Sequence, residues 1–202
     1  VNTDPSNGSV VMEDNGSYIY TPDQHWNGID SFTYMVSDEA SGSDIGMVTL
    51  IVNAVNDDVT LTSSIDDYSV DEDADPSTVA DLDDVFDDID ILNGDPSALQ
   101  ILTYSVVSNT NSDLATPSID ADTGVLTVSY RSDDNGSATI TVRADDSNGS
   151  TLDESFTVTV TAVNDDVTLT SSIDDYTVFE DATATTVADL DSIFDDIDIL
   201  NG

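Results

Sequence analysis

The stretch at residues 54–68 reads Ala-Val-Asn-Asp-Asp-Val-Thr-Leu-Thr-Ser-Ser-Ile-Asp-Asp-Tyr, and it returns unchanged at residues 162–176, 108 residues later. The similarity continues to the end of the chain, because residues 54–94 and 162–202 agree at 34 of 41 positions. A repeat about as long as one small domain is typical of a tandem array of modules, not of a single folded enzyme.

Charge is the strongest signal in the composition. Of the 202 residues, 43 are Asp or Glu and only two, Arg131 and Arg143, are Lys or Arg, so the formal net charge is −41. The lack of a basic patch disfavours binding to nucleic acid and to anionic membranes. So many like charges destabilise a compact state unless cations offset them. The sequence therefore predicts multivalent cations, high salt or both around the folded protein.

The rest of the composition narrows the possible chemistry. Hydrophobic residues make up 38% of the chain, below the usual ~45%, so we expect thin cores. Cysteine is absent, which removes disulfides and thiolate sites. No apolar run approaches the ~18 residues of a membrane-spanning helix, so no membrane insertion is predicted. No signal peptide opens the chain, and its start looks like a cut from a longer protein.

The repeat divides the chain into three parts. We expect residues 1–56 to be the C-terminal part of one module, 57–164 a complete module, and 165–202 the N-terminal part of a further module. A piece of about 36 residues is too small to bury a core alone. Two interpretations stay open. The chain is either a window from a long repeat protein or a unit whose last part completes the first part of the next chain.

Short runs rich in Val, Ile, Thr and Tyr, separated by Asn-Gly and similar pairs, predict strands in the first two parts. The predicted strands are residues 17–20, 30–36, 47–52, 59–61, 68–70, 102–107, 125–130, 138–143 and 155–161. Six or seven short strands in about 108 residues predict an all-β fold of immunoglobulin-like Greek-key β-sandwiches. Residues 78–88 could form one or two helical turns with their apolar side chains on one face.

Acidic groups recur at fixed positions in the repeat. They are the linker sequence Asn-Asp-Asp, an acidic pair after the second strand, a Phe-Asp-Asp-Ile-Asp segment, and one aspartate 19 residues before each linker aspartate. The candidate metal ligands are Asp38, Asn56, Asp57, Asp58, Glu72, Asp73, Asp87, Asp88, Asp90, Asp146, Asn164, Asp165, Asp166, Glu180, Asp195, Asp196 and Asp198.

Calcium suits these groups better than other metals. Ca²⁺ takes six to eight oxygen ligands in flexible geometry, and aspartates two apart on a loop, such as Asp88 and Asp90, can both face one ion. Mg²⁺ keeps its waters and uses few carboxylates, and softer metals prefer His or Cys. The alternative is that the acidic loops are only solvated or reflect adaptation to high salt.

Several segments resemble cadherin-like repeats, of the kind found in tandem in giant RTX-type bacterial surface adhesins. Val-Asn-Asp-Asp at residues 55–58 resembles the cadherin linker motif, and Ser-Ile-Asp-Ala-Asp-Thr-Gly-Val-Leu at 118–126 resembles the Ile-Asp-x-x-Thr-Gly-x-Ile segment. Arg-Ala-Asp-Asp-Ser-Asn-Gly at 143–149 resembles the segment before the last strand. Residues 16–22 and 26–34 resemble a second variety of adhesin repeat with the pattern G-x-Y-x-Y-T-P followed by F-N-G-x-D-S-F-x-Y.

The resemblance implies calcium ions between successive modules. At the first junction it implies Asp57, Asp58, Asp88, Asp90 and Asp146 as ligands. At the second it implies Glu72, Asp165, Asp166, Asp196 and Asp198. The family's Asp-Arg-Glu segment is missing, because residues 131–134 read Arg-Ser-Asp-Asp, and Ala54 stands where the linker motif has its leading aspartate. The number of ions at each junction therefore stays open.

Other candidate sites favour structural interpretations. His25 and Trp26 are the only residues of their kinds, and we expect a turn aromatic that closes one end of a sandwich, not a sugar-binding site. Four Asn-Gly-Ser triplets fit the glycosylation pattern, but Asn-Gly also favours hairpin turns, which we prefer. Paired carboxylates serve glycosidases, yet no distinct acid or aromatic subsite accompanies them, so we predict that the chain is not an enzyme.

We therefore predict calcium-binding extender repeats of a secreted or cell-surface adhesin, made rigid by Ca²⁺ at the junctions to project a distal adhesive domain. The expected partners are neighbouring modules of the same chain and other copies of it. Two alternatives stay open. One is an extracellular filament or surface-layer subunit that assembles head-to-tail, and the other is a module that itself binds carbohydrate or protein.

Overall fold

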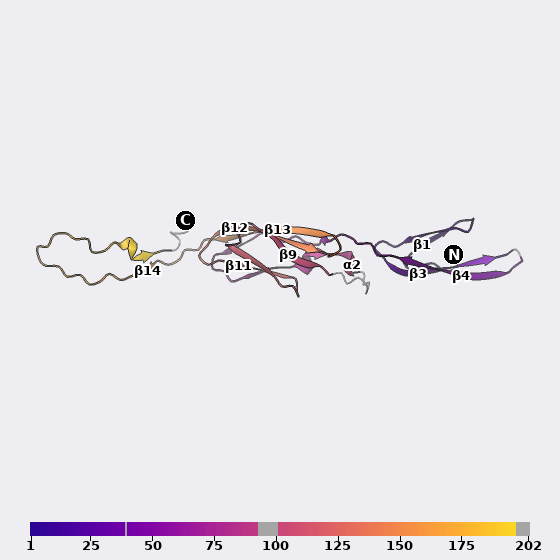
Figure 1. The fold of residues 1–202 in the computed structure, drawn as a ribbon, viewed down its shortest axis with the longest axis horizontal. Coiled ribbons are helices and arrows are strands. Elements are labelled where there is room, and N and C mark those ends of the chain that lie inside the picture. Colours follow the sequence, from indigo (N-terminus) through magenta and orange to yellow (C-terminus); the bar gives the residue numbers. More distant parts are fainter. Residues whose placement is uncertain (39, 93–100, 197–202) are drawn as a thin grey trace.

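The computed structural model describes residues 1–38, 40–92 and 101–196, and the chain forms three parts that follow one another along one long axis (Figure 1). We call residues 1–56 the head, 57–164 the central module and 165–196 the tail; these boundaries remain a prediction from the repeat. No helix in the described ranges is long and apolar enough to cross a membrane.

The head consists of two antiparallel strand pairs. Strand β1 (Gly8–Met12) pairs with β2 (Tyr18–Pro22), and β3 (Gly28–Ser37) pairs with β4 (Ser43–Val52). Alternation along β3 directs Phe32 into the space between the two pairs, where its ring meets that of Tyr18 edge-on at 5.0 Å. The outer face of β3 and β4 stays apolar and exposed.

The central module has two sheets. The first has four strands in the order β6 (Tyr68–Asp71), β13 (Thr151–Thr161), β12 (Gly136–Asp145) and β9 (Thr103–Asn109). The second has three strands in the order β10 (Ala115–Ile119), β11 (Val125–Tyr130) and β7 (Ser77–Asp81). All neighbours are antiparallel except β6 and β13, which run parallel.

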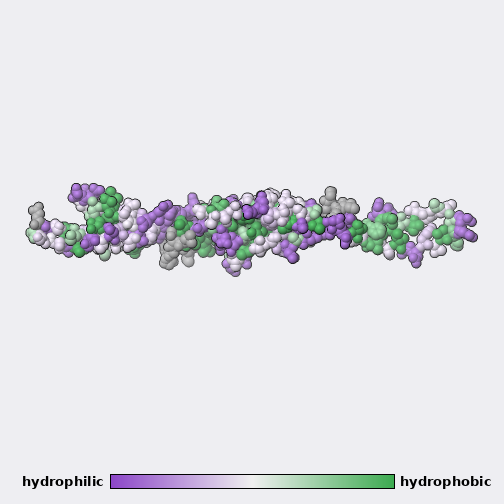
Figure 2. Space-filling view, turned by 180° about the vertical axis from the view of Figure 1, so that it is seen from behind, coloured by the Kyte–Doolittle hydropathy of each residue, from purple (hydrophilic) through white to green (hydrophobic). Residues whose placement is uncertain are grey.

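Alternating apolar residues from both sheets form one core between them. Leu126 and Val128 of β11 face Ile140, Val142, Phe156 and Val158 of the other sheet, and all are buried. Figure 2 shows, in contrast, hydrophobic side chains at the surface of both ends of the molecule. The prediction of an all-β sandwich is confirmed.

The segment predicted to contain helical turns forms a strand, one helical turn and a second strand. The first part, strand β7, is extended because its residues pair with β11. Helix α1 (Leu82–Val85) then begins where the Asp81 side chain accepts a hydrogen bond from the backbone N–H of Asp83. Strand β8 (Phe86–Asp87) follows and pairs with β5 (Thr60–Leu61), and helix α2 (Ile89–Leu92) completes this region.

Six strands were missing from the prediction: β7 and β8 in the segment just described, the two short strands of the tail, and β1 and β10. Strands β1 and β10 contain Gly or Pro, which weakens their sequence signal, and both are fixed by pairing with the following strand. Strand β9 also continues two residues beyond the predicted end, to Asn109.

The tail repeats the sequence of the central module's first part without its packing. Strand β14 (Thr168–Leu169) pairs with β15 (Phe194–Asp195), next to the short 3₁₀ helix Leu190–Ser192. Val167, Ile173 and Phe194 are exposed, although the corresponding residues 108 positions earlier are buried in the central module. In the central module the second half of the sandwich covers those positions.

Candidate metal centre at the two junctions

Acidic side chains gather where the head meets the central module. The Asn56 side chain donates a hydrogen bond to Asp146 Oδ2 at 2.8 Å. The backbone N–H of Asp57 donates to Asp90 Oδ2 at 2.8 Å, and the N–H of Asp90 donates to Asp88 Oδ1 at 2.9 Å. These five residues form the first cluster. It joins the linker to helix α2 and to the hairpin turn between β12 and β13.

Asp88 is the most unusual member of the first cluster. Its side chain is fully buried, and its Oδ2 atom has no hydrogen-bond partner among the described residues. Burial raises the pKa of this carboxyl above its ordinary value, and the nearby charges of Asp90, Asp146 and Asp57 raise it further. A buried acceptor without a donor is costly in free energy, so the position favours a cation beside it.

Asp146 is equally buried but well satisfied. Burial alone would raise its pKa, but the Asn56 amide and the backbone N–H groups of Asn148, Ser150 and Gly149 donate to it and hold its pKa below the usual range. Asp146 is therefore a fixed anion, and it keeps a negative charge next to Asp88 over a wide pH range.

The head contributes a histidine to this junction. His25 Nδ1 lies 2.8 Å from Asp57 Oδ2. His25 sits in the turn between β2 and β3 with φ of 57°, in the left-handed region. It lines a hollow together with Trp26, Asp57 and Asp90. The expectation of a purely structural turn aromatic did not anticipate this contact.

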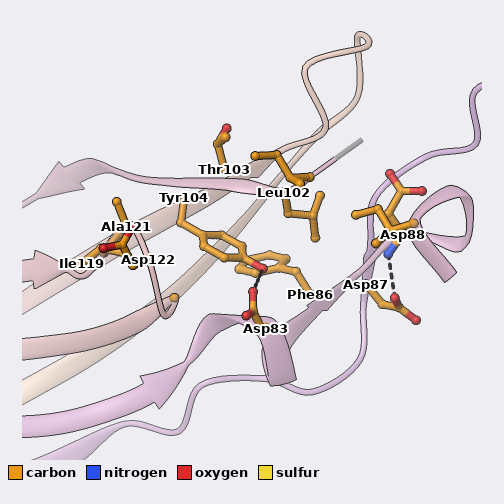
Figure 3. Close-up of a pocket in the computed structure, with 13 residues that line it drawn as sticks. Asp83, Phe86, Asp87, Asp88, Leu102, Thr103, Tyr104, Ile119, Ala121 and Asp122 are labelled. Atoms are coloured by element: carbon orange, nitrogen blue, oxygen red, sulfur yellow. Dashed lines mark hydrogen bonds between the residues drawn. The ribbon is translucent and has the colours of Figure 1, made fainter. Parts of the chain in front are cut away.

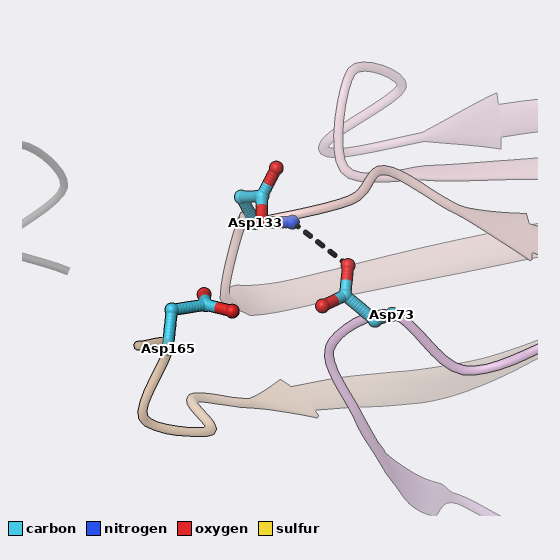
Figure 4. Close-up of side chains that lie close together, drawn as sticks. All are labelled: Asp73, Asp133 and Asp165. Carbon is cyan, nitrogen blue, oxygen red and sulfur yellow. Dashed lines mark hydrogen bonds between the residues drawn. The ribbon is translucent and has the colours of Figure 1, made fainter. Parts of the chain in front are cut away.

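A second cluster lies where the central module meets the tail. Carboxylate oxygens of Asp73, Asp133 and Asp165 lie within 4.8 Å of one another (Figure 4). Asp73 follows β6, Asp133 lies in the turn between β11 and β12, and Asp165 belongs to the linker. The backbone N–H of Asp133 donates to Asp73 Oδ1 at 3.2 Å. In the described ranges, no other set of three or more His, Cys, Asp or Glu side chains has its ligand atoms this close together.

Two further predicted residues hold the linker at the second junction. Buried Glu72 accepts a hydrogen bond from the backbone N–H of Val163 at 2.7 Å. The Asn164 side chain donates to the carbonyl of Asp165 at 2.6 Å, as Asn56 does to the carbonyl of Asp57 at 2.8 Å. The two linkers therefore adopt matching local structures.

The structure places the other predicted residues differently. Asp38 lies at the hairpin turn where it accepts from Ala40 and Gly42, at the opposite end of the ten-pair β3–β4 ladder from the first junction. Asp87 and Asp195 each accept a hydrogen bond from the backbone N–H of the next residue. Four more lie elsewhere: Asp58 and Asp166 are exposed in the linkers, and in the tail Glu180 is exposed and Asp196 is half-buried. Asp198 lies outside the described residues.

The sequence analysis missed Asp133. Its loop was interpreted only as a departure from the family's Asp-Arg-Glu segment. The usable signal was its position, because residue 133 follows the end of β11 closely and therefore returns to the end of the module that carries the second linker.

A hollow of the central module lies beside the first cluster (Figure 3). Its cavity of about 560 Å³ is lined by the stacked rings of Phe86 and Tyr104, whose centroids are 6.0 Å apart, and by Asp88. The Tyr104 hydroxyl donates to Asp83 at 2.7 Å, and burial together with this bond raises its pKa.

The donor atoms of both clusters fit a hard divalent cation. The side chains of both clusters offer carboxylate and amide oxygens, and the linker carbonyls of Asp57 and Asp165 lie beside them. His25, which contacts Asp57 of the first cluster, offers a nitrogen. Oxygen donors in flexible loops suit Ca²⁺. The unpartnered oxygen of Asp88, next to three further carboxylates, is the specific feature that a bound cation would satisfy.

Comparison with known proteins supports the fold. Residues 1–51 match the family model of a bacterial Ig domain. The chain is similar to mouse cadherin-23 EC22–24, with 18% identity, 84% of this chain and 57% of that one covered, and a TM-score of 0.54. It is also similar to protocadherin gamma B2 extracellular cadherin domains 1–5, with 17% identity, coverages of 79% and 32%, and a TM-score of 0.52.

Human mucin-like protocadherin EC1–2 is a further similar structure, with 16% identity, coverages of 80% and 85%, and a TM-score of 0.51. No curated protein matches the sequence. The chain spans about a third of the length of the protocadherin gamma B2 structure. Together these findings show that the chain has a cadherin-like, Ig-like β fold.

Proposed function

We propose that the chain is a calcium-binding spacer of an extracellular adhesin. Ca²⁺ ions at the two junctions would hold successive modules in line and so project a distal adhesive domain from a cell surface. The proposal makes the chain a structural protein, not an enzyme. It rests above all on Asp88, a buried carboxylate with an unpartnered oxygen at the point where linker and module meet.

The mechanism is electrostatic. Without a cation, the carboxylates of Asp57, Asp88, Asp90 and Asp146 repel one another across the junction. A bound Ca²⁺ replaces this repulsion with several oxygen contacts that connect linker and module. Because only the ordered arrangement offers all of these oxygens, binding also stabilises the folded state by mass action. The second cluster would act in the same way on the tail.

Thermal unfolding tests the proposal. Circular dichroism would be recorded at a fixed high NaCl concentration, first with EGTA, then with millimolar CaCl₂ or MgCl₂. We expect a rise in midpoint that is specific to Ca²⁺, since ligand at 100 times its Kd adds about 2.7 kcal/mol. The variant Asp88→Asn should lose most of this rise, and Asp84→Asn, an exposed aspartate of α1, should keep it. Stability that follows ionic strength alone would contradict the calcium mechanism.

A second candidate function is head-to-tail assembly of separate chains. The observation that favours it is the exposure of Val167, Ile173 and Phe194, whose counterparts are buried in the central module. The head of another copy could cover them and so complete a sandwich. Sedimentation velocity across a range of concentrations tests this. Growing oligomers that Phe194→Ser abolishes would support assembly, and a monomer at all concentrations would support the spacer.

A further inference from the structure

The two junctions are built from corresponding loops with one informative difference. Residues 23–27 connect β2 to β3, and residues 131–135 connect β11 to β12, so both loops have the same length. Both end in an Asn that is followed by the first Gly of the next strand, and their middle residues are 108 positions apart. The middle residue is His25 in the first loop and Asp133 in the second. Their φ angles, 57° and 56°, agree closely.

Both middle residues face the corresponding linker aspartate. His25 Nδ1 contacts Asp57 at 2.8 Å, and Asp133 has a carboxylate oxygen within 4.8 Å of one on Asp165. Asp57 and Asp165 are themselves 108 positions apart. The position is therefore equivalent in both junctions, and it carries an imidazole in the first and a carboxylate in the second.

An imidazole and a carboxylate treat Ca²⁺ differently. Ca²⁺ binds oxygen, and each added carboxylate brings both a ligand and a negative charge. The imidazole of His25 brings a nitrogen donor, which suits softer metals. In the described ranges only the second junction has three metal-ligating atoms within 4.8 Å of one another.

From this geometry we infer that His25 sets the calcium affinity of the first junction and keeps it below the value that an aspartate at this position would give. The inference rests on the proposed function. That the first junction is a cation site at all is supported independently by the buried, unpartnered oxygen of Asp88. His25 thereby determines the Ca²⁺ concentration at which the head becomes fixed to the central module.

A reciprocal exchange tests the inference in the full chain. The left-handed conformation is tolerated by both His and Asp, so His25→Asp and Asp133→His should both fold. Trp26 is the only tryptophan and lines the same hollow as His25 and Asp57, so its fluorescence reports on the first junction. Isothermal titration calorimetry with CaCl₂ measures the binding of Ca²⁺ to both junctions.

We expect His25→Asp to lower the midpoint of the Trp26 titration roughly tenfold or more, because it adds both an oxygen ligand and a negative charge. Asp133→His should weaken the calorimetric signal of the other junction by a similar factor and leave the Trp26 titration unchanged. His25→Asn, with an uncharged oxygen donor, should lie between the parent and His25→Asp.

The possible outcomes distinguish a failure of the role of His25 from a failure of the proposed calcium-binding function. Calcium binding with an unchanged midpoint in His25→Asp would overturn the role of His25 and leave the calcium function standing. A chain that binds no Ca²⁺ at either junction, in the parent and in both exchange variants, would overturn both. Each measurement compares the parent and a variant at the same junction. Differences between the neighbouring residues of the two junctions therefore do not affect the comparison.

Discussion

Asp88 makes the free energy of unfolding depend on pH. Its pKa in the folded state is raised by burial and by neighbouring charges. A raised pKa means that the folded state favours the protonated form, so its contribution to stability is present at low pH and is lost as pH rises through the raised value. Without Ca²⁺, an ionised Asp88 therefore destabilises the module near neutral pH.

The variant Asp88→Asn should remove this penalty. In EGTA at pH 8 we expect it to raise the free energy of unfolding by roughly 1 kcal/mol, while near pH 4 it should differ little from the parent. Urea unfolding at the two pH values measures this, with Asp84→Asn as a control of equal charge change. A variant that is less stable than the parent at pH 8 in EGTA would mean that Asp88 is satisfied without a cation.

Asp133 and Asp134 offer a matched pair for the second junction. Only Asp133 belongs to the cluster with Asp73 and Asp165, whereas Asp134 lies 3.6 Å from Arg131 as an exposed ion pair. We expect Asp133→Asn to reduce Ca²⁺ affinity at this junction at least several-fold, because it removes one charged ligand. Asp134→Asn should have little effect. Calorimetric titration with CaCl₂ measures the affinity of both variants. An equal loss of affinity in Asp133→Asn and Asp134→Asn would indicate a general charge effect.

Much of the candidate site was predictable because its residues recur with the repeat. Linker residues such as Asp57, and Asp88 and Asp90 with their recurring spacing of two, were named from the sequence, and the structure brings them together. Asp133 and His25 were not, because they lie in turns whose return to a linker depends on the path of β11 and β2. Asp38 shows the converse limit, since its fixed spacing from Asp57 follows from the length of the hairpin and not from proximity.

Helix α1 illustrates how short elements depend on a single side chain. The Asp81 carboxylate accepts the backbone N–H of Asp83 and so begins the turn that buries Leu82 and Val85. Asp81→Ala should destabilise the central module by about 1 kcal/mol. Asp84→Ala, in the same turn but without a capping role, is the control for urea unfolding. An equal loss in both would show that the cap contributes nothing.

Strands with a strong alternation of buried and exposed residues were predictable from the sequence. Strands that depend on pairing with a distant strand were not. Strands β12 and β13 show the alternation clearly, with buried Ile140 and Phe156 between polar neighbours. Strand β7 was interpreted as part of a helical segment, because Val79, Leu82 and Phe86 also fit a helical face. The pairing with β11 extends residues 77–81, and that long-range contact has no local signal in the sequence.

The three parts of the molecule should differ in their resistance to opening. The central module has a continuous buried core, whereas among the apolar side chains of the described tail only Ile193 is buried. Few buried contacts mean a low free energy of local opening. We expect thermolysin to cut within residues 165–196 well before it cuts the central module. Mass spectrometry of early fragments tests this order, and first cuts in residues 101–161 would contradict it.

The parallel pairing of β6 with β13 has a consequence for a chain under tension. β6 is one of the first strands of the central module and β13 is its last, and four residue pairs join them, from Tyr68 with Val158 to Asp71 with Thr161. A pull on the two ends of the module drags these strands past each other in opposite directions. The backbone hydrogen bonds between the two strands are then loaded in shear and must break together. A hairpin such as β3–β4, pulled at its open end, would instead lose its hydrogen-bonded pairs one at a time.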